Sequence, residues 1–288
     1  MFDWDDIRVF LATARAGTVR GAARRLGVTH ATVSRRLHGL EDKLGAQLFE
    51  RSAEGRVLSP VGHGIMPVAE QIEDRMAEID RRAFAQDTRM AGPVRLSVSE
   101  SFFQSILHPC LTAFQTRYPM IEIELTSTDR LSNLGKREAD IVVRITNTPP
   151  ESAYGRRIAA SPLACYGSKS YLENRPRLDR WVALTHKAAF EPIVPARRVA
   201  TANSGMAAAR LIGNGHGIGL LPCYVGDADP DLHRVPDTAL IPDLDIWILV
   251  HADIRSTPRV RALLDYIYAS VEDSRDLIEG RRAGRRAN

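Results

Sequence analysis

Two short amphipathic segments that meet at Gly27 constrain the fold of this chain more than any other feature of its sequence. They lie within AARRLGVTHATVSRRLHGLEDKLGAQLFER, which spans residues 22–51. Gly27 can take the left-handed conformation that ends a helix, Val28 can fill the core beneath the turn, and Thr29 can cap the helix that follows. The apolar residues of that helix recur at helical spacing, at Val33, Leu37, Leu40 and Leu44. Helices joined by so short a turn cross steeply, which predicts a helix-turn-helix, a motif whose second helix enters the DNA major groove.

The segments on either side of this motif complete a small domain. Upstream, apolar side chains at helical spacing predict another helix, which Gly17 ends before Thr18 caps the next one. These apolar residues are Trp4, Ile7, Phe10 and Leu11. Downstream, AQLFERSAEGRVLSP alternates apolar and polar residues about an Ala-Glu-Gly turn, as a short β-hairpin does. Such a wing would place Arg51 and Arg56 on the sugar-phosphate backbone.

Basic charge is concentrated in this N-terminal part. Residues 8–58 hold ten basic and four acidic side chains, a net +6, and since the whole chain carries +4 the remainder sums to −2. A basic module on a slightly acidic body is the charge distribution expected of a protein that meets phosphates at one end. A solvated helix face would explain Arg24 and Arg25 equally well, so charge alone does not decide between these interpretations.

The first turns of the second helix of the motif are the part that reaches base edges. Arg35 can pair with a guanine edge, His30 and Ser34 can hydrogen-bond to a base or a phosphate, and Ala31 or the Thr32 methyl can touch a thymine methyl. A solvent-exposed residue without a role is the alternative for His30. We expect DNA contacts, to phosphate in the case of Arg36, from Thr29, His30, Ala31, Thr32, Ser34, Arg35, Arg36, Arg51 and Arg56.

A narrow apolar stripe follows the wing and predicts a helix that dimerises. Its residues step by three or four positions, like a coiled-coil seam: Ile65, Val68, Ile72, Met76, Ile79 and Ala83. Packing onto the protein's own body is the alternative, but the opposite face is charged, which suits a free-standing helix. Pro67 leaves two further alternatives open. Either the helix begins near Met66 with Pro67 in its first turn, or an interior Pro67 kinks it.

The C-terminal part alternates predicted strands and helices. GPVRLSVS, IEIELTST and DIVVRIT are β-branched strands, and SFFQSILHPCLTAFQTRYP and RLSNLGKREA are the helical stretches between them. This β-α-β-α-β order implies a parallel sheet with helices on its faces, an α/β fold. A second such unit runs from LACYGS to GIGLLP, and the chain returns through DIWILVHADI to a last helix, PRVRALLDYIYASVED.

Polar residues gather where these strands end, which is where open α/β sheets bind ligands. Helix capping by Ser and Thr would explain any one of them, but their convergence favours a pocket for a small-molecule effector. Helix N-termini and Arg144 favour an anion, whereas a Glu100 carboxylate facing the cleft would favour an amine or a neutral polar ligand. The expected lining is Ser99, Glu100, Ser101, Phe102 (as an apolar wall), Thr126, Ser127, Arg144, Thr146, Asn203 and Pro222.

The sequence gives little support to an enzyme. GNGHGIG has Ile218 in place of the third glycine of a nucleotide-binding loop, so we interpret it as the tight start of a strand. No GxSxG, HExxH or P-loop motif occurs, and we expect no cofactor and no metal. Cys110, Cys165 and Cys223 lack any metal or redox spacing and are interpreted as buried core thiols.

Membrane insertion and export are not supported either. No run of eighteen apolar residues occurs, and the N-terminus is acidic where a signal peptide is basic, so we expect a cytoplasmic protein. A solute-binding protein without a DNA role would need export and would leave the first ninety residues unexplained.

The run from Asp5 to about Gln71 resembles the N-terminal domain of the LysR-type transcriptional regulators, through DIRVFLATARAGT, then AARRLGVTHATVSRRLHGLEDKLGAQLFER, then RVLSPVG. GPVRLSVS, GNGHGIGLLP and STPRVRALLDYI extend the resemblance over the remaining chain. It implies a DNA-binding regulator that responds to a small molecule through a two-lobed domain like a periplasmic solute-binding protein. It further implies a homodimer through the linker helix and a homotetramer, with RNA polymerase as a candidate partner. His30-Ala31 replaces the family's usual Gln-Pro pair, which changes base readout.

These inferences divide the chain into three parts. We expect a winged helix-turn-helix over 1–59, a linker helix over 60–89 and an effector domain over 90–288. Lobe I would comprise 92–162 and 258–280, and lobe II 163–257, with crossing strands near 160–165 and 250–257. The basic tail, 281–288, is expected to be disordered.

Overall fold

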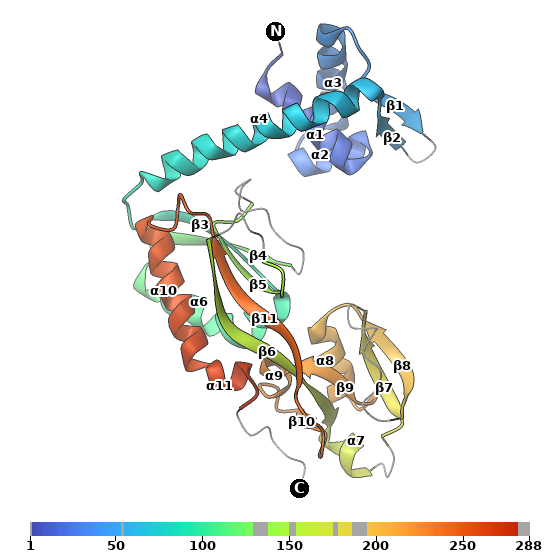
Figure 1. Cartoon of the computed structure of the whole chain (residues 1–288), viewed down its shortest axis with the longest axis vertical. Helices are drawn as coiled ribbons and strands as arrows, with labels where there is room; N and C mark the ends of the chain where they lie inside the picture. The colour runs from blue at the N-terminus through green and yellow to red at the C-terminus, as the bar shows by residue number, and fades with distance from the viewer. Residues whose placement is uncertain are drawn as a thin grey trace. The chain divides into compact units, whose positions relative to one another are not determined.

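The computed structural model describes residues 2–52, 55–128, 138–149, 154–174, 178–185 and 195–281. The chain forms two compact units that divide between Asp80 and Arg81, within a long helix (Figure 1). The expected tail falls outside these residues from position 282 onward, as does most of the helix expected over 130–139.

The first unit confirms the predicted helix-turn-helix. Helices α1 (Trp4–Ala16), α2 (Val19–Leu26) and α3 (His30–Leu44) are separated by glycines in the left-handed conformation, with φ 65° at Gly17 and 67° at Gly27. The side chains of Thr18 and Thr29 cap α2 and α3 as expected. Fully buried side chains from the three helices form the core: Phe10, Leu11, Ala22, Val33, Leu37 and Leu40.

Val28 does not fill this core. Its side chain is 42% exposed, whereas Leu26 before the turn packs against the core and Val33 after it is fully buried. The expectation was wrong because the helices on either side of the turn already supply the apolar contacts, which leaves the turn residue outside.

The predicted wing is an antiparallel hairpin of β1 (Phe49–Ser52) and β2 (Gly55–Leu58). It is fixed to the turn after α1, because the Arg56 N–H donates to the Gly17 carbonyl at 2.8 Å. Gly55 has a φ of 141°, and a Cβ there would lie 2.4 Å from that carbonyl, so only glycine allows this approach.

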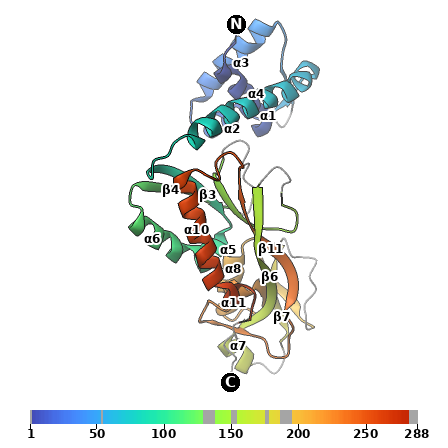
Figure 2. The same cartoon turned by 60° about the vertical axis from the view of Figure 1, so that its left-hand side comes forward.

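Helix α4 (Pro60–Ala85) is the predicted linker helix, and Pro67 lies inside it. It does not begin near Met66, because the Ser59 hydroxyl accepts the Gly62 N–H at 3.0 Å and caps a start at Pro60, where proline is tolerated. Figures 1 and 2 show α4 as one continuous helix.

The second unit is built on a seven-stranded sheet in the order β10-β6-β11-β5-β3-β4, with β9 also paired to β6 (Figure 1). The two pairings of β3, with β4 and with β5, are parallel, which confirms the α/β prediction for the first β-α-β-α-β segment. In the second such segment β7 and β8 pair parallel, but LACYGS and GIGLLP, in β6 and β9, pair antiparallel, which corrects the expectation of a second parallel unit. The strands are β3 (Gly92–Val98), β4 (Ile121–Ser127), β5 (Ile141–Ile145), β6 (Tyr154–Ser168), β7 (Arg180–Leu184), β8 (Arg197–Ala202), β9 (Gly219–Pro222), β10 (Leu232–Arg234) and β11 (Ile241–Val250). The helices are α5 (Glu100–Phe102), the π-helix η1 (Phe103–Leu107), α6 (His108–Arg117), α7 (Lys169–Asn174), α8 (Gly205–Gly213), α9 (Cys223–Gly226), α10 (Pro258–Asp273) and α11 (Arg275–Ile278).

Two antiparallel strands, β6 and β11, cross between the lobes of this unit. The first crossing lies at Ser161 to Leu163, within the expected range, but the second lies at Ile241 to Leu244, directly opposite, and not at 250–257. Antiparallel neighbours must cross at the same place, which fixes the second crossing. Residues 251–257 form the turn that follows β11.

The GNGHGIG segment leads from the end of α8 through a turn into a strand, which agrees with the tight strand entry that was predicted. Ile218 bridges to Trp181, and Gly219 opens β9. A Cβ on Gly217 would lie 2.5 Å from the Arg180 carbonyl and one on Gly219 2.6 Å from the Val182 carbonyl. These glycines therefore serve the close approach of β7.

Two of the three cysteines are core thiols as expected. Burial raises the pKa of the Cys165 thiol to about 12 and that of Cys223 to about 11, so neither is a thiolate at neutral pH. Cys110 is only half-buried, with its Sγ 3.4 Å from the Tyr266 carbonyl, which corrects the expectation for this residue.

Candidate DNA-binding surface and effector cleft

The N-terminal turns of α3 are exposed and are held by a cap. Thr29 Oγ1 accepts the Thr32 N–H at 3.2 Å, and the two hydroxyls lie 2.9 Å apart. His30, Ala31 and Arg35 are exposed, whereas Thr32 and Ser34 are half-buried. The expected base-reading side chains therefore lie on the surface, on a helix whose opposite face is core.

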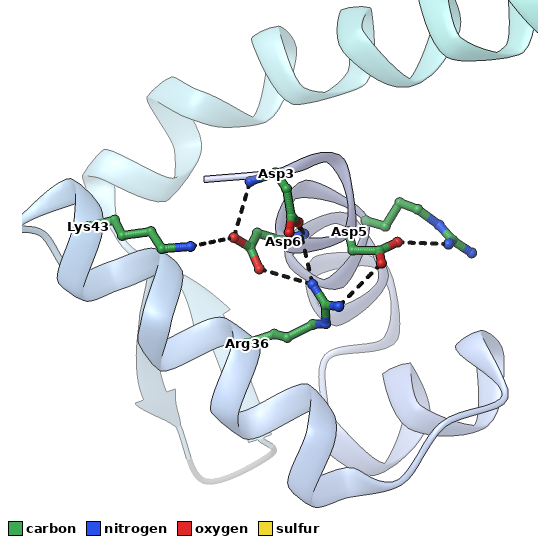
Figure 3. A network of polar contacts seen from close by, with 6 residues as sticks. Asp3, Asp5, Asp6, Arg36 and Lys43 are labelled. Atoms are coloured by element: carbon green, nitrogen blue, oxygen red, sulfur yellow. Dashed lines mark hydrogen bonds and ion pairs between the residues drawn. The ribbon is translucent and has the colours of Figure 1, made fainter. Parts of the chain in front are cut away.

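Arg36 does not face outward, contrary to its expected phosphate contact. Its guanidinium lies between three carboxylates at the start of α1, 3.4 Å from Asp3, 3.3 Å from Asp5 and 3.3 Å from Asp6 (Figure 3). Lys43, two turns further along α3, donates to Asp6 at 2.9 Å. These cations hold helices together, and the local sequence around Arg36 gave no sign of partners thirty residues away.

The remaining basic residues of the first unit separate into paired and unpaired groups. Arg8 pairs with Asp5 at 3.1 Å and Arg15 with Glu73 at 2.7 Å. Among the described residues of the first unit, six arginines form no ion pair: Arg20, Arg24, Arg25, Arg35, Arg51 and Arg56. Arg20 was missed, and Arg24 and Arg25 were left undecided. The sequence does indicate that these arginines lack nearby partners, because residues 7–40 contain no acidic side chain.

The wing places two of these arginines side by side. Arg51 lies directly opposite Arg56 in the hairpin register. Like charges at opposed positions of an antiparallel pair destabilise it by up to about 1 kcal/mol. An anion bound between them would relieve this repulsion, which is the chemistry of a phosphate contact.

The apolar stripe of α4 is divided between core and solvent. Ile65 packs against the core of the first unit, so the own-body alternative holds there. Further along, four of its side chains are exposed on the single chain: Val68 by 56%, Ile72 by 37%, Met76 by 37% and Ile79 by 61%. Exposed apolar side chains that recur on one face of a helix indicate a surface for a partner.

A cavity of about 480 Å³ lies between the lobes of the second unit. Its lining comes from the ends of β3, β5, β7, β8 and β9 and from both crossing strands: Ser99, Ser101, Arg144, Ile145, Ser161, Leu184, Thr185, Asn203, Gly205, Pro222, Tyr224, Asp243 and Leu244. Of the expected effector residues, Ser99, Ser101, Arg144, Asn203 and Pro222 are in this set.

The other expected residues lie elsewhere. Phe102 is fully buried and packs edge-on against Tyr224, with ring centroids 5.4 Å apart, so Tyr224 forms the wall that Phe102 was expected to form. The Glu100 carboxylate accepts a hydrogen bond from Ser204 at 3.3 Å and does not line the cavity. The argument for an amine ligand that rested on Glu100 therefore loses its basis.

The remaining differences concern Thr126, Ser127 and Thr146, and strand order explains the first two. Thr126 and Ser127 are exposed at the end of β4, which is the outermost strand beyond β3, and Thr146 hydrogen-bonds to Thr148 at 3.3 Å. None of the three lines the cavity.

Four polar lining residues were missed. They are Ser161, Thr185, Tyr224 and Asp243. Ser161 and Asp243 lie on the crossing strands. The apolar pattern of these strands does not predict which strand ends they pass.

Two lining hydroxyls have capacity for a ligand. The Oγ atoms of Ser99 and Ser161 are buried and have no hydrogen-bond partner among the residues that the structure describes. Arg144, 4% exposed, donates to the Ser97 hydroxyl at 2.7 Å, which fixes its guanidinium at the wall. Buried polar atoms are almost always paired, so these two hydroxyls are available to hydrogen-bond to water or to another polar molecule in the cavity.

A winged helix-turn-helix, a helix with an exposed apolar face and a two-lobed α/β domain around a cavity define a class of ligand-responsive DNA-binding regulators. Residues 4–63 match the family described as bacterial regulatory helix-turn-helix protein, lysR family. Residues 87–271 match the LysR substrate binding domain. The chain belongs to the LysR family of DNA-binding transcriptional regulators, which carry an effector-binding substrate domain.

Known proteins of similar sequence cover nearly the whole chain. The probable HTH-type transcriptional regulator LtrA of Klebsiella pneumoniae is 25% identical, over 92% of this chain and 94% of LtrA. The Mau operon transcriptional activator of Paracoccus denitrificans is 24% identical, over 92% of this chain and 95% of its own. Among solved structures, full-length AphB of Vibrio cholerae has a TM-score of 0.64 at 21% identity, covering 93% of this chain and 99% of AphB.

A structure of full-length CbnR complexed with its target DNA has a TM-score of 0.55 at 20% identity, over 93% of this chain and 100% of CbnR. At these identities the structural likeness shows the fold. Among the residues described, no helix is long and apolar enough to cross a membrane, and no group of three or more metal-ligating side chains occurs.

Proposed function

We propose that this chain regulates transcription as a dimer that binds two DNA half-sites, and that a small-molecule effector in the cleft between the lobes changes this binding. It acts by binding and not by catalysis. The observation that carries the proposal is the segregation of charge in the first unit, where six arginines without ion pairs accompany the exposed start of α3. The experiment that tests it is a DNA-binding titration of the arginine variants.

In this proposal α3 reads bases and the arginines around it hold phosphates. His30, Ala31, Ser34 and Arg35 meet base edges in the major groove, and the cap residues Thr29 and Thr32 fix the start of the helix. Arg20, Arg24, Arg25, Arg51 and Arg56 meet phosphates. Arg36 is left out of this set, because three carboxylates already occupy its guanidinium.

Arg51→Ala is expected to weaken binding to all duplexes alike, because a phosphate contact carries no sequence information. Because each chain of the dimer would lose one phosphate contact, the slope of log affinity against log salt should fall by about two. Arg8→Ala is the matched control, since Arg8 is an exposed arginine already paired with Asp5. Anisotropy titrations at several salt concentrations measure the affinity and the salt slope of each variant. If the two variants have the same slope, the wing does not contact phosphate.

The dimer forms through α4 in this proposal. A second copy of the exposed apolar side chains, Val68, Ile72, Met76 and Ile79, would cover the first. A helix seam joins identical faces of two chains without any further element. It would hold the two winged helix-turn-helix domains together. Assembly of two dimers into a tetramer and a contact with RNA polymerase stay predictions from the family resemblance.

The effector site that we propose is the cavity between the lobes. The hydroxyls of Ser99 and Ser161 supply hydrogen bonds, Asn203 contributes from the start of α8, and Tyr224 and Leu184 supply apolar contact. Because the lining comes from both lobes, a ligand can bind one arrangement of the lobes better than another, as a switch requires.

Ser99→Ala and Ser161→Ala are each expected to lower effector affinity by about five- to tenfold, the loss of one hydrogen bond. Small carboxylates, amines and neutral polar metabolites are screened by thermal shift, and the molecules that bind are titrated by calorimetry. Thr126→Ala, an exposed change outside the cavity, is the control. A ligand that alters DNA binding yet binds all three variants with wild-type affinity would place the effector site elsewhere.

A further inference from the structure

Asp6 is a buried carboxylate that joins α1 to α3. It is 4% exposed, and its Oδ2 accepts from Lys43 at 2.9 Å and from the Asp3 N–H at 3.2 Å, while its Oδ1 accepts from Arg36 at 3.3 Å (Figure 3). Burial raises the pKa of this carboxyl, but the hydrogen bonds from Lys43, Asp3 and Arg36 bring it below its ordinary value. Asp6 is therefore ionised wherever DNA binding is measured.

The two cations that Asp6 holds lie on one side of α3. Arg36 and Lys43 are seven residues apart, which is about two turns and roughly 10 Å along the helix axis. Two charge-assisted contacts at separate points of one side resist rotation of α3 about its axis. Such contacts are directional, whereas apolar packing is not.

The other side of the apolar stripe of α3 is also fixed. Glu41 is 3% exposed, and its Oε1 accepts the Leu48 N–H at 2.8 Å. Leu37 and Leu40, between the two sides, are fully buried. Polar contacts on both flanks of the stripe therefore set how far α3 is rotated relative to α1.

Rotation matters because the reading residues lie on the same helix. Arg35 is exposed and adjoins Arg36 in the chain. A rotation of about 20° moves a side chain at the outer radius of a helix by roughly 2 Å. Hydrogen bonds to base edges fail over such a distance, whereas long arginines can still follow phosphates.

We propose that Asp6 is a positioning residue for operator readout, which holds α3 at the rotation that presents Arg35 and its neighbours to the bases by acting through Arg36 and Lys43. This inference rests on the proposed function of α3 as the reading helix. It gives Arg36 and Lys43 a role in sequence discrimination without any contact to DNA.

The test uses the full chain with Asp6→Asn and duplexes that the wild type selects from a random pool. Affinity for the selected duplex should fall about tenfold. Affinity for an unrelated duplex and the salt slope should stay within about twofold of wild type, because the phosphate contacts remain. An unchanged ratio of the two affinities would overturn the proposal, whether both affinities stay at the wild-type value or both fall by the same factor.

Three further variants complete the test. Asp5→Asn is the control, because Asp5 is exposed and also contacts Arg36 but not Lys43. It should change the ratio much less than Asp6→Asn does. Asp6→Asn combined with Lys43→Gln should discriminate no worse than the poorer single variant, since Lys43 pairs with no other carboxylate among the residues that the structure describes. An additive loss would contradict this.

If Asp6→Asn does not fold, Lys43→Gln decides, since it removes one of the two contacts from a side chain that is 42% exposed. A wild-type affinity ratio in that variant overturns the proposal. Failure of the proposed function is recognised separately. If Arg35→Ala leaves the ratio unchanged, α3 does not read bases; if it lowers the ratio while Asp6→Asn does not, only the role of Asp6 is wrong.

Discussion

Ile72→Asp is expected to dissociate the dimer and to lower operator affinity by about a hundredfold or more. Ile72 lies on the exposed apolar face of α4, and pairing that face with its copy would bury the new carboxylate among apolar side chains, which costs several kcal/mol. Two half-sites held by one dimer gain affinity through effective concentration, and separate chains lose that gain. Sedimentation gives the assembly state, and anisotropy titration gives the affinity.

Gln71→Asp is the matched control for this change. Gln71 is exposed on the same helix, one position before Ile72 but outside the apolar stripe, so the same charge there should leave the dimer intact. If Ile72→Asp sediments as the wild-type assembly does, α4 does not form the seam and the oligomer is held by another surface.

Arg35→Ala is expected to lower affinity for the selected duplex by ten- to a hundredfold for each half-site, because a bidentate contact to a guanine contributes about 1–3 kcal/mol. Discrimination should relax at one base position of each half-site. The thermal unfolding temperature should not change, since Arg35 is exposed and forms no ion pair with any residue that the structure describes.

The comparison with Arg24→Ala separates reading from phosphate binding. Arg24 is exposed on α2. Arg24→Ala should therefore lower the affinity for selected and unrelated duplexes by the same factor. If Arg35→Ala behaves in the same way as Arg24→Ala, Arg35 binds phosphate, and another residue of α3 carries the discrimination.

The N-terminal fold could be predicted because its signals are local. Gly17 and Gly27 end helices through their own backbone conformation, and Thr18 and Thr29 cap the helices that begin beside them. The start of α4 was harder to predict, because Ser59 and Pro60 precede the stripe by a full turn and the interior proline was a more conspicuous feature.

The site residues were harder to predict where their position depends on distant parts of the chain. The partners of Arg36 lie at the start of another helix, so its ion pairs could not be inferred from the residues around it, and a phosphate contact was expected instead. Thr126 shares the strand-end pattern of Ser99, but strand order places β4 at the outer edge of the sheet. Ser161 and Asp243 line the cavity because β6 and β11 cross there, which depends on pairing across eighty residues.

The central claim is that this chain reads a specific DNA sequence as a dimer through α3. Selection of bound duplexes from a random pool by the full-length wild-type chain, followed by sequencing, tests it most directly. The account predicts two half-sites related by a dyad, and loss of preference at one position of each half-site with Arg35→Ala. A recovered pool with the base composition of the input, or an identical pool from Arg35→Ala, would contradict it.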